Sequence, residues 1–146
     1  MASSASRNDP LASFNFIIKV DNISAGFSEV GGLATETDII EYRTGDADIT
    51  VSKIPGKRKY TNISLKRGYT TNGKDLWAWR KTVMDGKTQR KGGTITLLDE
   101  ARKPALTWEF ADGWPSKWAG PALNAKNNEI AIEELEICIE GLTLQT

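Results

Sequence analysis

Few residues in this chain have the types and spacing that catalysis requires. The sequence contains no histidine, which removes the commonest general base and a frequent metal ligand. Its single cysteine, Cys138, excludes an internal disulfide and a cysteine-cluster metal site. Cys138 lies among residues with the alternation of a strand, so we expect it to be a small buried or half-buried hydrophobic side chain.

Carboxylates recur near the end of the chain, at Glu134, Glu136 and Glu140. Such a set could serve glycoside hydrolysis or bind a cation. We favour a solvent-facing side of a β-strand, because residues two apart share one face. Asp46 and Asp48 resemble a calcium loop only faintly, since the other ligands are missing, and we interpret them as turn residues.

The motifs of common enzyme classes are also missing. The sequence has no P-loop, no dinucleotide-binding glycine motif, no nucleophile elbow and no zinc-protease motif. Serine precedes lysine at 52–53 and 116–117, but adjacent residues of an extended segment point to opposite faces. The sequence therefore predicts no catalytic residue, no metal site, no cofactor and no enzyme activity.

The charges are balanced, with 19 basic and 19 acidic residues and a formal net charge of zero. This balance argues against a general nucleic-acid binder, whose affinity depends on neutralising phosphates. Basic clusters at 57–59, 66–67, 80–81 and 90–91 could form a nucleic-acid surface with nearby aromatics. We favour ordinary solvated surface, because acidic residues lie close to them. A neutral subunit is also well suited to packing against copies of itself.

The length suits one domain. Residues 1–11 are small and polar without periodicity, so we predict a flexible N-terminal arm before a single domain over 12–146. Phe14–Val20 alternates apolar and polar residues, and Ile23–Val30 follows a turn, which together predict a hairpin. No signal-peptide pattern and no apolar run of about 18 residues occur, so we expect synthesis in the cytoplasm and no membrane insertion.

The next segment predicts an extended two-stranded arm. Thr35–Arg43 and Ile49–Ile54 are rich in β-favouring residues around a turn at Thr44–Asp48. Pro55-Gly56 is expected to end the arm, and 57–59 to be a basic loop. An isolated two-stranded arm is marginally stable in water. Another surface should therefore pair with it.

One helix is predicted, over Lys74–Asp85, after a strand at Asn62–Gly68. Its apolar stripe comprises Leu76, Trp79 and Val83. Thr71 or Asn72 is expected to cap the first turn, and Gly86 to end the helix. Two large apolar side chains, Trp77 and Met84, lie outside this stripe. The helix therefore has more apolar surface than packing against one sheet face requires.

The C-terminal half again favours β structure. Thr94–Leu98 and Ala105–Phe110 predict two strands, followed by an irregular segment at 112–120 and a loop at 121–128. Glu129–Glu140 predicts a long strand. A β-bulge is expected near Glu133 and Glu134, because the apolar residues before this point and those after it alternate one residue out of phase. The sum is a mainly β fold, a small β-barrel or two packed antiparallel sheets with one α-helix and an extended β-arm.

Several stretches together resemble the tail-tube protein family of contractile phage tails and extracellular contractile injection systems. The most specific are PGKRKYTNISLKRG, DLWAWRK and WPSKW followed by LNAKNNEIAIEELE. The resemblance extends from about Asp9 to Leu142. The type VI secretion tube protein shares the fold of this family with different motifs.

The resemblance implies a structural subunit of an inner tube. Six copies would close into a ring, and rings would stack into a hollow tube that can hold cargo and that sheath contraction drives through a target envelope. The implied partners are the chain itself, a sheath protein, and baseplate and tube-cap proteins. The particle would be assembled in the cytoplasm and then released or membrane-anchored. A baseplate or tube-initiator protein of the same fold, or a small nucleic-acid-binding β-barrel, remains as an alternative.

Three surfaces are expected to carry this assembly. The arm should supply contacts between stacked rings through Tyr42, Ile54, Pro55 and Arg58. The outer side of the helix should contact the sheath or a neighbouring subunit through Trp77, Arg80, Lys81 and Met84. A polar sheet face that includes Glu134 and Glu136 should line the lumen.

Overall fold

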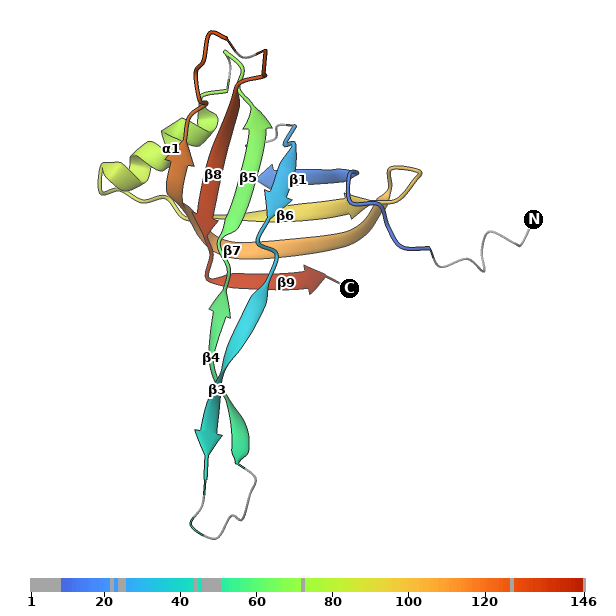
Figure 1. Ribbon diagram of the computed structural model, residues 1–146, viewed down its shortest axis with the longest axis vertical. Helices are drawn as coiled ribbons and strands as arrows, with labels where there is room; N and C mark the ends of the chain where they lie inside the picture. The colour runs from blue at the N-terminus through green and yellow to red at the C-terminus, as the bar shows by residue number, and fades with distance from the viewer. Residues whose placement is uncertain are drawn as a thin grey trace, which may run out of the picture.

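The computed structural model describes residues 9–21, 23, 26–43, 45, 51–71, 73–126 and 128–145. Figure 1 shows a body of two sheets with one helix beside it and a long two-stranded arm that leads away from the body. The elements in chain order are β1 (Phe16–Val20), β2 (Glu29–Gly31), β3 (Thr35–Tyr42), β4 (Ser52–Tyr60), β5 (Ile63–Gly68), α1 (Asp75–Met84), β6 (Lys91–Leu98), β7 (Pro104–Ala119), β8 (Ile132–Cys138) and β9 (Gly141–Gln145).

The body consists of two antiparallel sheets that share the long strand β7. The first half of β7 lies between β6 and β9, and β1 pairs with the other edge of β6. The second half of β7 pairs with β8, which continues to β5 and β2. The strands of the two sheets run across one another in Figure 1. The predicted mainly β fold of two packed antiparallel sheets, one helix and an arm is confirmed.

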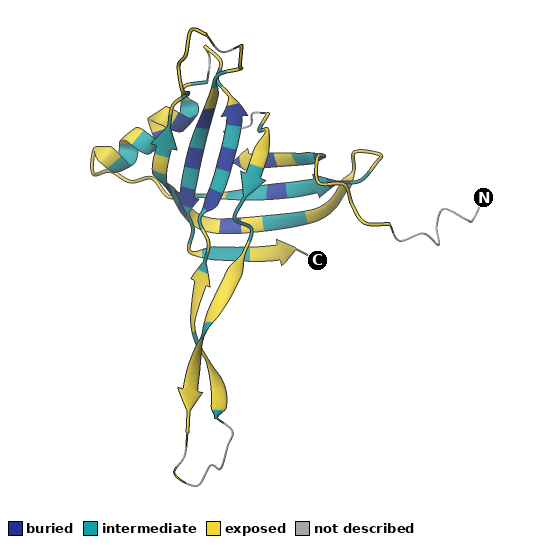
Figure 2. Cartoon of the chain, in the orientation of Figure 1, coloured by how far each residue is buried: buried dark blue, intermediate teal, exposed yellow. Residues whose placement is uncertain are grey.

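The core lies between these sheets and under α1, and it is dark blue in Figure 2. Its buried apolar side chains are Ile18, Val20, Ile23, Ile63, Leu65, Leu76, Trp79, Ile95, Phe110, Leu135 and Ile137. They come from both sheets and from the helix. Because all of these elements are amphipathic, burying their apolar faces against one another holds the body together.

The predicted N-terminal hairpin is wrong. Among the residues described in this turn, a single bridge joins Val20 to Ile23. β1 instead pairs with β6, and β2 pairs with β5 in the other sheet. The pairing of β1 with β6 places Ile18 opposite Ile95, which buries both. The strand also begins later than expected, since Phe14 precedes it and is 82% exposed.

The segment 112–120 is not irregular but forms the second half of β7. The strand changes sheets close to Asp112, whose φ of 54° is in the left-handed region. A side chain at Gly113 would meet Phe110 and Ile137, so the bend requires a glycine there. Pro115 is buried beyond the bend. A bent strand of this kind carries its apolar residues from one sheet into the other.

The predicted bulge near Glu133 and Glu134 is also wrong. β8 pairs with β5 in one unbroken register. Glu133 is fully buried and in phase with Leu135 and Ile137. A carboxylate can occupy this core-facing position because Arg67 of β5 lies opposite it. The strand is shorter than expected, and the sequence did not predict β9, which follows it.

The helix is confirmed over Asp75–Met84. Its end has the geometry of a Schellman motif, in which Gly86 has a φ of 76° and donates to Val83 O at 3.1 Å. The residue before the helix is Lys74, and it makes no side-chain capping bond, so Thr71 does not cap it. The other predicted cap, Asn72, lies outside the described residues.

Two further predictions fall largely outside the described residues. These are the flexible character of residues 1–11, of which 9–11 are described, and the arm turn at Thr44–Asp48, of which only Gly45 is described.

Candidate assembly surfaces

The arm is the most exposed element of the described chain. β3 and β4 pair with each other and with no other described strand, and Figure 2 shows them almost entirely exposed. β4 does not end at Pro55-Gly56 as predicted, but continues through 57–59 to Tyr60. A register shift at Asp38 accommodates the irregular backbone at Pro55-Gly56. Pro55 itself is tolerated because each strand of the arm has one edge that pairs with no other strand.

All four residues predicted for ring stacking lie on this arm. Tyr42 and Ile54 are about half exposed, and Pro55 and Arg58 are also exposed. A shallow hollow of about 310 Å³ lies against the arm, and its lining includes Ile54 and Pro55. The arm therefore presents apolar side chains that its own molecule does not cover.

The two strands of the arm differ in charge. The acidic residues of β3 are Glu36, Asp38 and Glu41, and this strand has no basic residue. The basic residues of β4 are Lys53, Lys57, Arg58 and Lys59, and this strand has no acidic residue. Lys59 Nζ lies 3.0 Å from Asp38 Oδ1, and this contact raises the pKa of Lys59.

The outer side of α1 forms a second surface. Trp77 is 40% exposed and Met84 is 51% exposed, and Lys81 is exposed between them. Arg80, which was grouped with them, is half buried and donates from Nη1 to Pro115 O at 3.2 Å. Arg80 therefore holds α1 against β7, whereas the other three remain available to another molecule.

An aromatic cluster supports Trp77. Its ring meets Trp118 of β7 edge to face, with centroids 5.0 Å apart, and Trp118 meets Tyr69 in the same way at 6.3 Å. Edge-to-face contacts of this kind add stability beyond the area they bury. The exposed part of Trp77 is therefore held in a fixed position rather than free to rotate.

Glu134 and Glu136 lie on the face of β8 that points away from the core. Ser64 donates to Glu134 Oε1 at 3.4 Å, and Asn62 donates to Glu136 Oε1 at 3.2 Å. Lys66 lies opposite Glu134 in the register. The predicted polar sheet face is present, with charges of both signs.

Sequence reasoning missed a buried ionic network beneath the helix. Arg67 donates to Glu133 of β8 and to both carboxylate oxygens of Asp75 at the start of α1. Trp118 Nε1 donates to the second oxygen of Glu133 at 3.1 Å. The Arg67 guanidinium also lies 5.7 Å from the centre of the Phe27 ring. The network ties β5, β7, β8 and α1 together.

The ion pairs of this network lower the pKa of Asp75 and compensate the buried charge of Glu133. Burial by itself would raise the pKa of Asp75, but the hydrogen bonds and charge of Arg67 outweigh burial and hold that pKa below its ordinary value. Glu133 is fully buried, and both of its oxygens are hydrogen-bonded. The network is therefore satisfied, as a buried charge requires.

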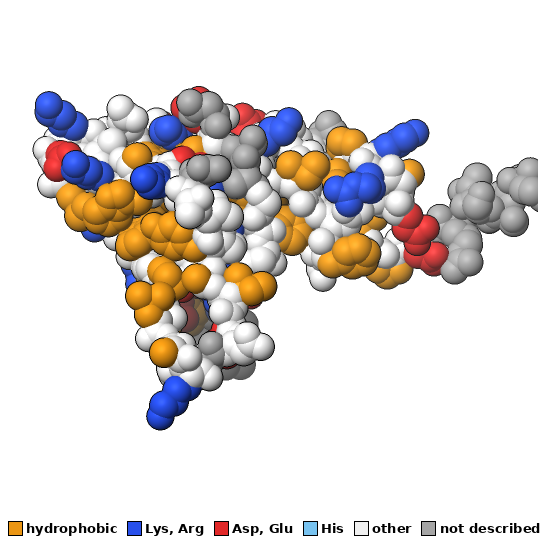
Figure 3. Space-filling model, turned by 90° about the horizontal axis from the view of Figure 1, so that it is seen from above, with side chains coloured by type: hydrophobic (Ala, Val, Ile, Leu, Met, Phe, Trp, Pro, Cys, Tyr) orange, Lys and Arg blue, Asp and Glu red, His pale blue; other side chains and the backbone are white. Residues whose placement is uncertain are grey.

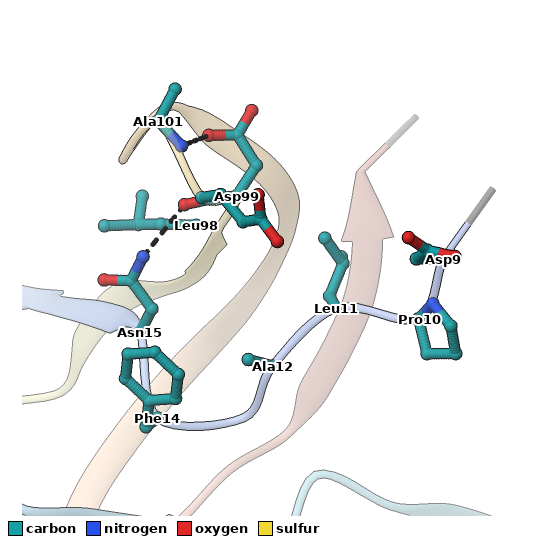
Figure 4. Close-up of a pocket in the computed structure, with 10 residues that line it drawn as sticks. Asp9, Pro10, Leu11, Ala12, Phe14, Asn15, Leu98, Asp99 and Ala101 are labelled. Atoms are coloured by element: carbon teal, nitrogen blue, oxygen red, sulfur yellow. Dashed lines mark hydrogen bonds between the residues drawn. The ribbon is translucent and has the colours of Figure 1, made fainter. Parts of the chain in front are cut away.

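A hollow of about 950 Å³ lies between the N-terminal segment and the turn after β6, and Figure 4 shows it. Asn15 Nδ2 donates to Asp99 O at 2.9 Å, and Arg102 donates to Asn15 Oδ1 at 2.9 Å. The Asp99 carboxylate accepts from two backbone N–H groups of the turn. These polar groups hold the turn together, and the lining has no nucleophile paired with a base.

Metal ligands do not gather anywhere in the part of the chain that the structure describes. No group of three potential ligands that could hold a metal occurs among them. Cys138 is half buried, as expected. Within the described ranges α1 is the one helix, and it is too short and too polar to cross a bilayer. Figure 3 shows basic side chains scattered among hydrophobic ones over one end of the molecule, without one continuous basic patch on that face.

Among the solved structures that share this fold are chains of contractile injection systems. A chain of the PVC sheath–tube complex of an extracellular contractile injection system, in the extended state, is 27% identical with a TM-score of 0.89, covering 99% of this chain and 97% of that one. A chain of the anti-feeding prophage tube-terminating cap is 27% identical with a TM-score of 0.88, covering 100% and 99%. Hcp1 from Flavobacterium johnsoniae, 14% identical with a TM-score of 0.59 over 90% and 94%, shares the fold alone.

The fold and its uncovered arm thus define a structural protein of the tail-tube class. The family model of the T4-like virus tail tube protein gp19 matches residues 12–143, and the chain belongs to this family. No curated protein matches the chain. The resemblance inferred from the sequence motifs is confirmed, and the chain has the role of a tail tube protein of contractile injection systems.

Proposed function

We propose that this chain forms the inner tube of a contractile injection system as stacked hexameric rings. The observation that carries the proposal is the likeness over nearly the whole length of both chains to a subunit of the PVC sheath–tube complex. The exposed arm supports it, because one surface that contacts a different surface on the next copy extends an assembly without limit. The tube would be hollow, would hold cargo, and would be driven through a target envelope on sheath contraction.

In this proposal the three surfaces have separate tasks. The arm contacts the adjacent ring through Tyr42, Ile54, Pro55 and Arg58. The outer side of α1, with Trp77, Lys81 and Met84, faces the sheath or a neighbouring subunit, and Arg80 fixes the helix that carries them. The face with Glu134 and Glu136 lines the lumen.

The other partners are baseplate and tube-cap proteins, since chains of a baseplate and of a terminating cap share the fold. The chain would act without a cofactor and without catalysis, by assembly alone. It would have no nucleic-acid specificity and would not enter a membrane by itself. Assembly would occur in the cytoplasm, and the finished particle would be released or membrane-anchored.

A baseplate or tube-initiator role is the second candidate. The observation that favours it is a fold match, at a TM-score of 0.84 and 21% identity, to a chain of the anti-feeding prophage baseplate. An initiator would form one ring and stop, whereas a tube subunit would stack ring upon ring. The two roles therefore predict different particle lengths.

Negative-stain electron microscopy of the purified full chain tests the proposal. We expect six-fold rings that stack into tubes, and single rings in a Tyr42→Asp/Ile54→Asp variant. The matched control is Ala101→Asp in the exposed turn after β6, which should leave the tubes unchanged. A wild-type chain that stays monomeric at high concentration would overturn the proposal, and single wild-type rings would favour the initiator. Long tubes of the arm variant would refute the stacking role of the arm.

A further inference from the structure

The arm leaves the body at residues 32–34 and 61–62, which we call the joint. The ladder of β2 with β5 reaches Gly31, and the ladder of the arm begins at Thr35. Figure 1 shows the two strands of the arm leading away from the body at this place. The direction of the arm relative to the body therefore depends on the joint.

The backbone of the joint is closely packed. Gly32 has a φ of 87°, in the left-handed region, and a β-carbon there would collide with the carbonyl oxygen of Asn62. Thr61 N donates to Ala34 O at 3.2 Å, and Ala34 N donates to Gly32 O at 2.8 Å. The two chains of the joint thus touch through backbone atoms at a position that has no room for a side chain. A rotation at Gly32 would break this contact.

Two side chains of the joint are tied to the body. Leu33 packs against the core. Asn62 Nδ2 donates to Glu136 Oε1 of β8 at 3.2 Å, and both residues are half buried. The residue after Asn62 is Ile63, which is fully buried. One chain of the joint is thus held by the core, and the other is held by the core and by β8.

We propose that Leu33 and Asn62 are positioning residues for assembly, because they fix the direction of the arm before another copy binds. The inference rests on the proposed tube-forming function, and it concerns the single chain rather than the surfaces that the arm contacts. An arm that could swing would lose that freedom when rings stack, and this loss would weaken stacking. A joint that is already fixed avoids the loss.

The two adjacent glycines at this place do not form a hinge. Gly31 has open space around it, but it is opposite Ser64 in the ladder of β2 with β5. Gly32 follows that ladder, but it is packed against the backbone of Asn62. The first glycine is therefore held by strand pairing and the second by close contact, so neither can turn without breaking the structure around it.

Loosening the joint tests the inference. The first variant is Asn62→Ala, which removes the hydrogen bond to Glu136 and leaves the core unchanged. The second variant adds Leu33→Ala, which also removes the contact with the core. The matched control is Ser64→Ala, because Ser64 also donates to a carboxylate of β8, Glu134, but lies within the ladder. Urea unfolding checks that each variant is folded, and Asn62→Ala alone carries the test if the second variant is not.

The direction of the arm is measured in single copies by pulsed electron paramagnetic resonance. Spin labels are attached at Glu36→Cys on the arm and at Lys103→Cys on the body, in a Cys138→Ala background. Both labelled positions are exposed. We expect one narrow distance distribution for the chain with an intact joint and for Ser64→Ala. The distribution should be broader for Asn62→Ala and broadest for the second variant.

Tube formation by the unlabelled variants is measured by pelleting and electron microscopy. We expect the critical concentration for tubes to rise at least about threefold in the second variant and to stay at the wild-type value in Ser64→Ala. The concentration at which single rings form should be the same for all of them, because the arm is assigned to contacts between rings and not within them.

Three results would overturn the inference while leaving the tube function intact. One is a broad distance distribution in single copies with an intact joint. Another is a distribution for both joint variants that equals that of Ser64→Ala. The third is a broadened distribution with an unchanged critical concentration, since stacking then does not depend on the direction of the arm. Failure of the wild type to form tubes would instead overturn the proposed function, and the distance distributions would still show whether the joint is fixed.

Discussion

Replacing Arg67 with methionine should destabilise the subunit more than any surface substitution. The guanidinium is the cation that compensates Glu133, which is fully buried, and it also binds Asp75. Methionine keeps an unbranched apolar side chain that reaches about as far as Nε of the arginine, so the change removes the charge, its hydrogen bonds and the outer part of the guanidinium. Glu133 would keep only the bond from Trp118 Nε1.

The size of the effect follows from the burial of Glu133. Removing one partner of a buried ion pair costs about 3 to 5 kcal/mol, because the remaining charge is left uncompensated. Replacing both partners by apolar residues is far less costly. A variant with both Arg67→Met and Glu133→Leu should therefore lose only about 1 to 3 kcal/mol, mainly from the Trp118 N–H that has lost its acceptor.

Urea unfolding followed by tryptophan fluorescence measures these differences, at a concentration where sedimentation shows single copies. The matched control is Lys66→Met on the same strand, since Lys66 pairs with Glu29 at the surface, and it should change the free energy of unfolding by no more than about 1 kcal/mol. The reasoning is refuted if Arg67→Met behaves like Lys66→Met. It is equally refuted if the double variant loses the sum of the two single losses.

Two further predictions concern the helix. The pKa of Asp75 is lower in the folded chain than its ordinary value of 3.8, so its ion pair stabilises the fold above that pH and the contribution is lost as pH falls through the lowered pKa. The difference in unfolding free energy between wild type and Asp75→Asn should be constant near neutrality and shrink below about pH 4, and a difference that grows in acid would contradict it. Gly86→Ala should cost about 1 kcal/mol in thermal or urea unfolding, because alanine is strained at a φ of 76° although no atom blocks its β-carbon. No loss would mean that the helix ends differently.

The helix and those strands that have a regular local pattern of apolar residues were predicted correctly. α1 follows from a stripe of apolar residues that ends at Gly86, and β5 follows from strict alternation at Ile63 and Leu65. Partners distant in the sequence were not predictable in this way. β1 pairs with β6 rather than with the segment that follows it, because strand pairing is decided by the burial of Ile18 against Ile95 and not by proximity in the chain.

Local breaking signals were given too much weight. Pro55-Gly56 predicted the end of a strand, but an open edge and a register shift accommodate both residues. The segment 112–120, which contains Trp114-Pro115, was predicted to be irregular, but it forms the bend and the second half of a continuous strand. Tertiary pairing on either side of the bend outweighs the local preference for a turn.

The ionic network did leave a signal in the sequence. Arg67 is in phase with the buried residues of β5, and Glu133 is in phase with those of β8. Two opposite charges, each in the core phase of its strand, indicate that the strands are neighbours and that the charges pair. The prediction of a bulge instead explained Glu133 by moving the register, because the pairing of β5 with β8 was unknown.

The shared strand β7 makes the body one cooperative unit. Its first half carries the ladders to β6 and β9, and its second half carries the ladder to β8. The two ladders use different halves of this strand, but the apolar faces of the two sheets bury each other in one core, so neither sheet can open without exposing the other. Amide protons of both sheets should therefore exchange through the same global opening, so the two sheets unfold together and no stable half-folded subunit accumulates.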